Sequence, residues 1–186
     1  MPTYDELRAS AASAWQAYAE PSRPLFIVSM NTSSIAAGAQ ETLDTLRALS
    51  ESGAGFDVAI TGDTGMSFAE PVVLVRRPGA ATVWYRNITA DRAESFASTA
   101  KAGVAKEFAI GIDGPASGGV PSLSDLDWMK LQVRWMMHNC GAIDPDSLDH
   151  YIARGGYSTF LESAAMDRDQ LISVVTGSTL RGHSGS

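Results

Sequence analysis

The sequence predicts an α/β protein, because short apolar strands and amphipathic helices alternate along roughly its first hundred residues. Residues 25–29 (LFIVS) are an apolar run of strand length, and residues 36–51 repeat leucine at helical spacing. Residues 56–61 (FDVAIT) then return to the alternation typical of a strand. A strand, a helix and a second strand in this order are typical of a small layered α/β structure.

The elements on either side of this unit have local signals of their own. Thr3 followed by Glu6 is a capping-box pattern and predicts a helix over 3–20, which the prolines of 20–24 end. The turn PGAA lies between two strand-like runs and predicts a hairpin. The two strand-like runs are VVLVRR (72–77) and ATVWYR (81–86). A further helix is expected after them, over residues 89–102.

The composition changes after the last of these helices. Residues 110–125 are rich in glycine and proline and predict a linker or extended arm. An apolar stripe follows, and it is either a partner-binding surface or the packing face of a helix on its own domain. The stripe consists of Trp128, Leu131, Trp135 and Met136. The expected divisions are an N-terminal helix (1–23), an α/β domain (24–104), a linker (105–124) and a helical segment (125–186).

Composition excludes several classes of function. The net charge of −7 argues against nucleic-acid and anionic-membrane surfaces, both of which need clustered lysine and arginine. Cys140 is the single cysteine, so neither an intrachain disulfide nor a four-cysteine cluster can form within the chain. The N-terminus lacks the apolar core of a signal peptide, and no apolar run approaches the roughly 18 residues of a membrane span. We therefore expect a soluble, cytoplasmic protein.

Two loops follow predicted strands, where α/β proteins place chemistry. They read SMNTSSIAAG from Ser29 and GDTGMSFAEP from 62 to 71. The first loop lacks the lysine and glycine spacing of a phosphate loop, although a small anion at the helix N-terminus near Ser34 is one possible ligand. From these residues alone the loops are weak signals.

The whole chain nevertheless resembles the N-terminal part of the NADH-oxidising flavoprotein subunit of respiratory complex I. It is more similar to the relatives in soluble NAD-linked hydrogenases and formate dehydrogenases, which carry an extra thioredoxin-like domain in front. The most specific segment is NCGAIDPDSLDHYIARGGYSTF (139–160), and the resemblance continues through MDRDQLISVVTGSTLRGHSGS (166–186). It extends over nearly everything from about residue 24 onward and implies a thioredoxin-like domain, a linker and a small helical segment.

In that family the front domain holds a two-iron, two-sulfur cluster on cysteines, two in each loop. The resemblance places these four positions at Ser29, Ser34, Asp63 and Ser67. Iron–sulfur clusters need thiolates, and a serine hydroxyl is a poor ligand because it holds its proton at neutral pH. We therefore expect no metal site in this chain, with Asp63 capping a turn instead.

The tail also resembles the family only in part. Arg181, Gly182 and Gly185 match the start of a glycine-rich loop that wraps the flavin phosphate, and they are the candidate cofactor-binding residues. His183 and Ser184 stand where arginine and glycine are usual. The FMN, NAD and four-iron cluster sites of the family are expected beyond this sequence. We thus expect no cofactor in this chain by itself and no catalytic residue.

Three hypotheses follow. The first is a non-catalytic, cluster-less subunit that serves assembly or subunit interaction in an NADH-linked oxidoreductase complex, with other subunits or a second copy as partner. The second is one part of a split NADH:acceptor oxidoreductase, which completes an FMN/NADH site with another chain. The third is a stand-alone binding domain for a small anion near Ser34.

Overall fold

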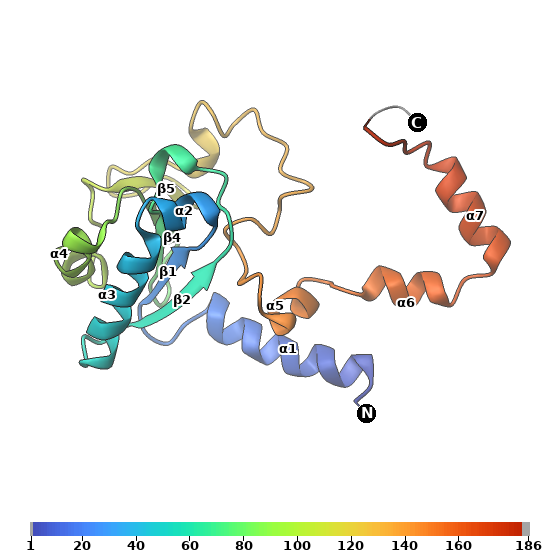
Figure 1. Ribbon diagram of the computed structural model, residues 1–186, viewed down its shortest axis with the longest axis horizontal. Coiled ribbons are helices and arrows are strands. Elements are labelled where there is room, and N and C mark those ends of the chain that lie inside the picture. The colour runs from blue at the N-terminus through green and yellow to red at the C-terminus, as the bar shows by residue number, and fades with distance from the viewer. Residues whose placement is uncertain (1, 184–186) are drawn as a thin grey trace.

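A five-stranded mixed sheet forms the centre of the molecule (Figure 1), and the computed structural model describes residues 2–183. The elements are α1 (Tyr4–Ala19), β1 (Leu25–Ser29), α2 (Thr32–Ala36), α3 (Ala39–Glu51), β2 (Asp57–Thr61), the 3₁₀ helix η1 (Ser67–Ala69), β3 (Val73–Arg76), β4 (Thr82–Tyr85), α4 (Ala90–Ala100), β5 (Ala109–Asp113), the 3₁₀ helix η2 (Leu123–Asp125), α5 (Leu148–Ala153), α6 (Ser158–Ala164) and α7 (Arg168–Gly177). The α/β class predicted from the sequence is confirmed.

The strands lie in the order β2-β1-β3-β4-β5. β1 and β2 are parallel, with Leu25 opposite Asp57 and Ser29 opposite Thr61, while β3 is antiparallel to both of its neighbours, β1 and β4. β5 adds an antiparallel edge strand beside β4. The first four strands, with the helix α3 between β1 and β2, have the arrangement of a thioredoxin-like fold.

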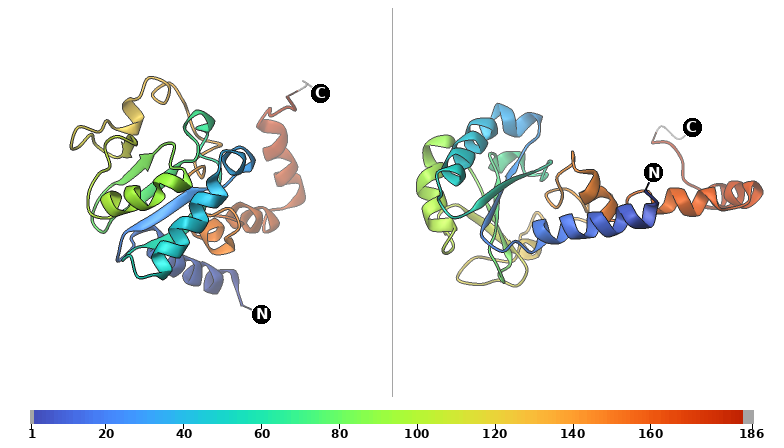
Figure 2. Two further views of the ribbon diagram at one scale, coloured as in Figure 1. Left: turned by 60° about the vertical axis from the view of Figure 1, so that its left-hand side comes forward. Right: turned by 90° about the horizontal axis from the view of Figure 1, so that it is seen from below.

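Helices α3 and α4 together cover one face of the sheet (Figure 2). Each helix buries an apolar stripe against the strands, because its apolar side chains recur at three- and four-residue spacing. The centre of this layer is aromatic, with the ring centroids of Phe26 and Phe56 4.4 Å apart. Its larger side chains are those of Phe26, Val28, Leu43, Leu46, Phe56, Val73, Val75, Tyr85, Ile88 and Phe96.

The opposite face of the sheet is covered differently. Only the C-terminal half of α1 reaches it, and an irregular segment after η2 covers the rest. Tyr18 anchors α1 here, since its hydroxyl donates to the Ile60 carbonyl at 3.3 Å and its own carbonyl accepts from Nη1 of Arg76 at 2.9 Å. The side chains buried on this face are Tyr18, Leu25, Ile27, Met66, Ala69, Val72, Leu74, Trp84 and Leu123.

The C-terminal helices leave the sheet. α5 packs along α1, whereas α6 and α7 trail away from the body (Figure 1). Neither α6 nor α7 contains a buried residue. Their apolar side chains are therefore without cover within the described part of the chain.

Most of the local predictions are confirmed. The strand at 25–29 has the predicted bounds, the hairpin strands lie within the predicted runs, and the capping box of Thr3 and Glu6 is present at the start of α1. The helix predicted at 36–51 is α3, which begins three residues later, at Ala39, and the short helix α2 precedes it without a corresponding prediction. Gly38 separates them with a left-handed φ of 98°, a conformation that glycine adopts at low cost.

The linker predicted at 105–124 requires a correction, since its residues 109–113 are strand β5 of the sheet. Gly111 is one of the glycines that make this stretch resemble a linker. It also allows Leu123 to pack on the sheet, because a Cβ atom at this position would lie 2.9 Å from Cδ2 of Leu123. A glycine inside a strand marks such a close approach. The α/β domain therefore extends at least to Asp113, and the other predicted divisions stay predictions.

The apolar stripe at 128–136 is not a helix but a series of turns. Contacts with the body hold this segment in place, and they outweigh helix propensities of a few tenths of a kcal/mol per residue. Leu131, Trp135 and Met136 are 84%, 79% and 85% exposed. Trp128 does pack on the body, with its ring centroid 5.3 Å from that of Phe68, so the choice between the two interpretations stays open and partner binding remains a prediction for the three exposed residues.

Candidate functional site: the loops after β1 and β2

The two loops lie together at one edge of the sheet. They follow β1 and β2, whose carboxyl ends meet at this edge because the two strands are parallel and paired in register. The hydroxyl of Ser29 donates to the carbonyl of Gly62 at 3.0 Å and joins the loops directly. The structure therefore brings together the two segments that the resemblance had paired.

The first loop is a closed, hydrogen-bonded turn. Ser29 and Ser34 are both fully buried, and the Ser34 hydroxyl donates to the Ser29 carbonyl. The backbone N–H of Ser34 donates to Oδ1 of Asn31 at 2.8 Å, which makes Asn31 the N-cap of α2. An anion near Ser34 would need this N–H, which is already bonded, so the geometry gives the third hypothesis no support.

The second loop has its own turn chemistry. Oδ1 of Asp63 accepts from the N–H of Gly65 at 2.7 Å, so this carboxylate caps a turn in which Gly65 has a φ of 77°. Ser67 is exposed and opens the short helix η1. The two positions of this loop therefore differ from those of the first loop, where both side chains are buried.

Glu70 joins the two loops, a role that the sequence did not reveal. Its Oε1 accepts from Nδ2 of Asn31 at 3.1 Å and from the hydroxyl of Ser33 at 2.9 Å. Glu70 is distant from both partners in sequence, so no local spacing pattern signals the contact.

The residues present do not fit an iron–sulfur cluster. The hydroxyls of Ser29 and Ser34 act as donors to carbonyl groups, so both oxygens hold their protons and turn toward the backbone. Ligation by serine would require loss of those protons and of the hydrogen bonds that close the turn. Within residues 2–183, no group of three or more His, Cys, Asp and Glu side chains is placed to hold a metal ion.

The irregular segment after η2 lies over the second loop. Nη2 of Arg134 donates to the carbonyl of Thr64 at 3.2 Å, and the hydroxyl of Thr61 donates to the carbonyl of Ile143 at 2.7 Å. A cavity of about 200 Å³ remains between the segment and the loop, and both Asp63 and the partly buried Cys140 line it. The chain's own backbone therefore covers one side of the second loop.

The candidate flavin-loop residues lie apart from this edge of the sheet. Arg181 and Gly182 are exposed and follow α7, while Gly185 lies outside the described residues. The structure therefore does not bring them together with Ser29, Ser34, Asp63 and Ser67. No helix among residues 2–183 combines the length and the apolar character that a membrane crossing requires.

Comparison with known proteins gives a relation by sequence. The chain is 40% identical over 57 residues to the NADP-reducing hydrogenase subunit HndC of Solidesulfovibrio fructosivorans. The predicted resemblance to subunits of NAD(P)-linked hydrogenases is confirmed over these 57 residues. The match covers 31% of this chain and 12% of that relative, so this chain corresponds to a small part of the relative's length.

Family models and solved structures give less information than the sequence match. No protein-family model matches the chain. Among solved structures, a thioredoxin-like [2Fe-2S] ferredoxin from Aquifex aeolicus is similar at 13% sequence identity with a TM-score of 0.42. The similarity covers 51% of this chain and 96% of that chain.

Proposed function

We propose that this chain is a non-catalytic, cluster-less subunit that serves assembly or subunit interaction in an NADH-linked oxidoreductase complex of the cytoplasm. The observation that carries the proposal is the uncovered apolar surface of α6 and α7. A monomeric protein rarely leaves such a surface exposed on consecutive elements. The apolar positions are Phe160, Leu161, Leu171, Ile172, Val174 and Val175.

The loops support the non-catalytic part of the proposal. Ser29 and Ser34 use their hydroxyls to close a turn, and Asp63 uses its carboxylate for another. Such contacts maintain the shape of the loops without thiolates. A chain with this shape retains a surface for partners while it leaves electron transfer to other subunits.

The relation to a hydrogenase subunit supports the choice of partner. We propose that α7 docks on another subunit of an NAD(P)-linked oxidoreductase, one that carries the flavin. Ile172 and Val175 are 53% and 65% exposed and lie three residues apart, on one face of α7. Ser173 lies on the same helix and offers a polar position for comparison.

The test is affinity capture from the native host with the full chain and with two charge variants. We expect the double variant Ile172→Glu/Val175→Glu to lose the partner, because burial of either side chain contributes about 1.5–3 kcal/mol and a buried carboxylate adds a further cost. Ser173→Glu is the control and should retain capture. Mass spectrometry must identify the captured protein as an NAD(P)-linked oxidoreductase subunit.

Each outcome has a defined meaning. Both variants should keep the melting temperature of the unchanged chain, because the substituted positions are exposed. Capture that the double variant retains would contradict docking through α7. Self-association of the purified chain that the double variant abolishes would assign the surface to a second copy and refute the proposed partner.

The second candidate function is a split NADH:acceptor oxidoreductase. It is favoured by Arg181 and Gly182, which are exposed just beyond α7 and accessible to another chain. Under this alternative, Arg181→Gln would remove the yellow flavin absorption of the captured complex and leave capture intact. Under the first proposal the flavin absorption of the complex stays unchanged, since FMN and NAD bind only to the partner.

A further inference from the structure

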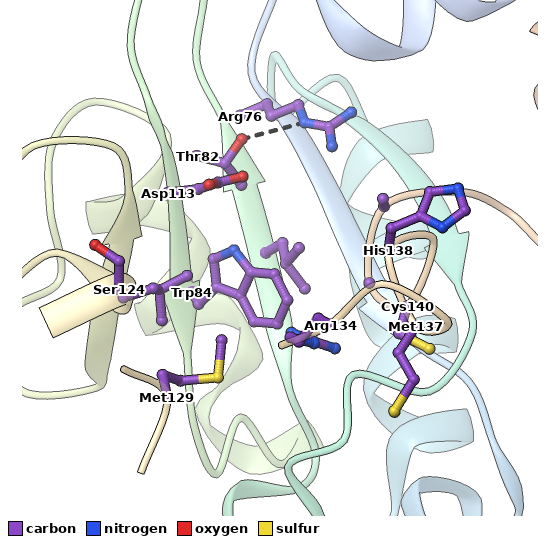
Figure 3. Close-up of a pocket in the computed structure, with 14 residues that line it drawn as sticks. Arg76, Thr82, Trp84, Asp113, Ser124, Met129, Arg134, Met137, His138 and Cys140 are labelled. Atoms are coloured by element: carbon purple, nitrogen blue, oxygen red, sulfur yellow. Dashed lines mark hydrogen bonds between the residues drawn. The ribbon is translucent and has the colours of Figure 1, made fainter. Parts of the chain in front are cut away.

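A cavity of about 270 Å³ lies on the second face of the sheet (Figure 3), and it shares Cys140 with the smaller cavity beside the second loop. Strands β3 and β4 form one wall, and η2 with the irregular segment after it forms the other. The apolar lining side chains are Leu74, Trp84, Leu123, Met129 and Met137. The indole ring of Trp84 lies in the middle of the lining residues (Figure 3).

Two guanidinium groups, those of Arg76 and Arg134, line the same cavity. Within residues 2–183, no carboxylate lies within 4.0 Å of Arg76 or Arg134. Arg76 is held by the carbonyl of Tyr18 and by the hydroxyl of Thr82, at 2.9 and 3.2 Å. Burial lowers the pKa of the Arg76 guanidinium, because the charged form loses hydration.

Two buried donors belong to residues that line the cavity, and neither has a hydrogen-bond partner within residues 2–183. They are Nε1 of Trp84, a residue only 6% exposed, and Nε of Arg134. A buried donor without a partner costs about 1–3 kcal/mol, so its presence in a folded protein requires an explanation. Both unpartnered atoms are donors, so the wall behind the cavity is electropositive, although neither atom is itself accessible from the cavity.

The charges of the cavity are unevenly distributed. Asp113 lines the cavity near Arg76, and its negative charge raises the pKa of that guanidinium against the larger effect of burial. Arg134 projects from the covering segment, and its Nη2 donates only to the neutral carbonyl of Thr64. The Arg134 side is therefore the position where an anionic group finds an uncompensated charge.

We propose that this cavity binds a small organic anion, with a carboxylate on Arg134 and an apolar body against the indole of Trp84. Arginine suits a carboxylate because its planar fork presents parallel donors. The cavity lies slightly below the usual range for drug-sized ligands, about 300–1,000 Å³, which limits the ligand to a small metabolite. The inference does not rest on the proposed function, since α7 takes no part in the cavity and the second loop meets it only where Arg134 donates to the carbonyl of Thr64.

The test is an NMR titration of the full ¹⁵N-labelled chain with benzoate as the probe. Comparison with Trp84→Phe assigns the indole N–H signal of Trp84. We expect this signal to shift saturably with benzoate, while benzyl alcohol, of the same shape but neutral, leaves it in place. Arg134→Gln should weaken benzoate binding about tenfold or more, since a hydrogen bond to a charged group contributes about 1.5–3 kcal/mol.

Two further variants complete the design. Arg47→Gln removes an exposed arginine from α3, which covers the other face of the sheet, and should leave the affinity unchanged. Ser124→Glu places a negative charge at the exposed rim of the cavity and should weaken benzoate binding even if Arg134→Gln disturbs folding.

Three results would overturn the inference. The first is no saturable shift of the Trp84 indole signal up to the highest soluble concentration of benzoate. The second is a shift of equal affinity with benzyl alcohol, which would make the contact purely apolar. The third is an equal response to inorganic phosphate, which would mean an adventitious ion only.

Discussion

Gly141 lies against the indole of Trp84 with a φ of 73°, and a Cβ atom there would lie 2.5 Å from Cη2 of the ring. We predict that Gly141→Ala lowers the free energy of unfolding by about 2–5 kcal/mol, from left-handed strain of about 1–2 and overpacking of about 1–3. Gly79→Ala is the matched control, because Gly79 has a φ of 67° and nothing within 4 Å. Urea denaturation measures both changes, and equal losses would refute the contact with Trp84.

Residue roles could be predicted from the sequence where the partners are close in the chain. The capping box of Thr3 and Glu6 and the turn at Asp63 both join residues two or three positions apart. Glu70 and Arg134 could not be recognised in this way, because their partners lie 37 to 39 and 70 positions away. Contacts of that range depend on strand order, which single residues do not reveal.

At the scale of elements, α5 docks on α1 through a buried histidine. His150 is 8% exposed and its ring centroid lies 4.4 Å from that of Tyr18 and 5.5 Å from that of Trp15. The N–H of Asp144 donates to Nδ1 of His150 at 3.1 Å, which requires that this nitrogen carry no proton. The α1–α5 contact is therefore built for a neutral imidazole.

This contact makes the stability of the protein depend on pH. Burial lowers the pKa of His150, Arg76 lowers it slightly further, and the carboxylates of Asp144 and Asp149 oppose the shift. Arg154 lies over the ring of Trp15 on the same contact, and burial raises the pKa of Tyr18 to about 12, so Tyr18 stays neutral. The pKa of histidine in the unfolded chain is about 6.5. Below this pH the His150 side chain binds a proton in the unfolded chain more readily than in the folded chain, where its pKa is lower.

We therefore predict that the free energy of unfolding falls as the pH drops below about 6.5 toward the lowered pKa of His150, and that this residue adds little slope above about pH 7.5. His150→Asn keeps an acceptor for the Asp144 N–H but does not titrate, so the slope should flatten although the overall stability decreases. His138→Gln, at an exposed histidine, is the control. Chemical denaturation at a series of pH values tests this, and an unchanged slope in His150→Asn would contradict it.

Element prediction succeeded where the hydrophobic period was strong and failed where composition misled. The buried strand at 25–29 has five consecutive buried residues and the predicted bounds. The glycines and prolines around strand β5 are typical of a linker, although Gly111 is the residue that lets Leu123 approach the sheet. The stripe at 128–136 has helix-favouring residues, but tertiary contacts such as Arg134 with Thr64 decide its path.

At the scale of the whole molecule, the sheet and its two covering layers form a body to which α6 and α7 contribute no buried residue. α1, by contrast, contributes Ala11 and Tyr18 to the buried set and an N-terminal contact, since the Tyr4 hydroxyl donates to the Gly156 carbonyl at 2.7 Å. The loop edge and the cavity adjoin through Arg134 and Cys140, whereas a separate surface is formed by the C-terminal helices. Loss of the last should leave the first two intact.

We predict that a chain shortened to residues 1–157 unfolds with a free energy within about 0.5 kcal/mol of the full chain, as for changes at exposed positions. It retains every buried side chain of both core layers and the hydrogen bond of Tyr4 with Gly156. Removal of residues 1–20 is the contrasting change, and loss of Tyr18 alone should cost about 3 kcal/mol or more, as for truncation of a buried aromatic side chain. Guanidinium denaturation followed by near-ultraviolet circular dichroism measures both. If the 1–157 chain lost stability comparably to the chain without α1, then α6 and α7 would support the body, and the docking surface assigned to them would have to be sought elsewhere.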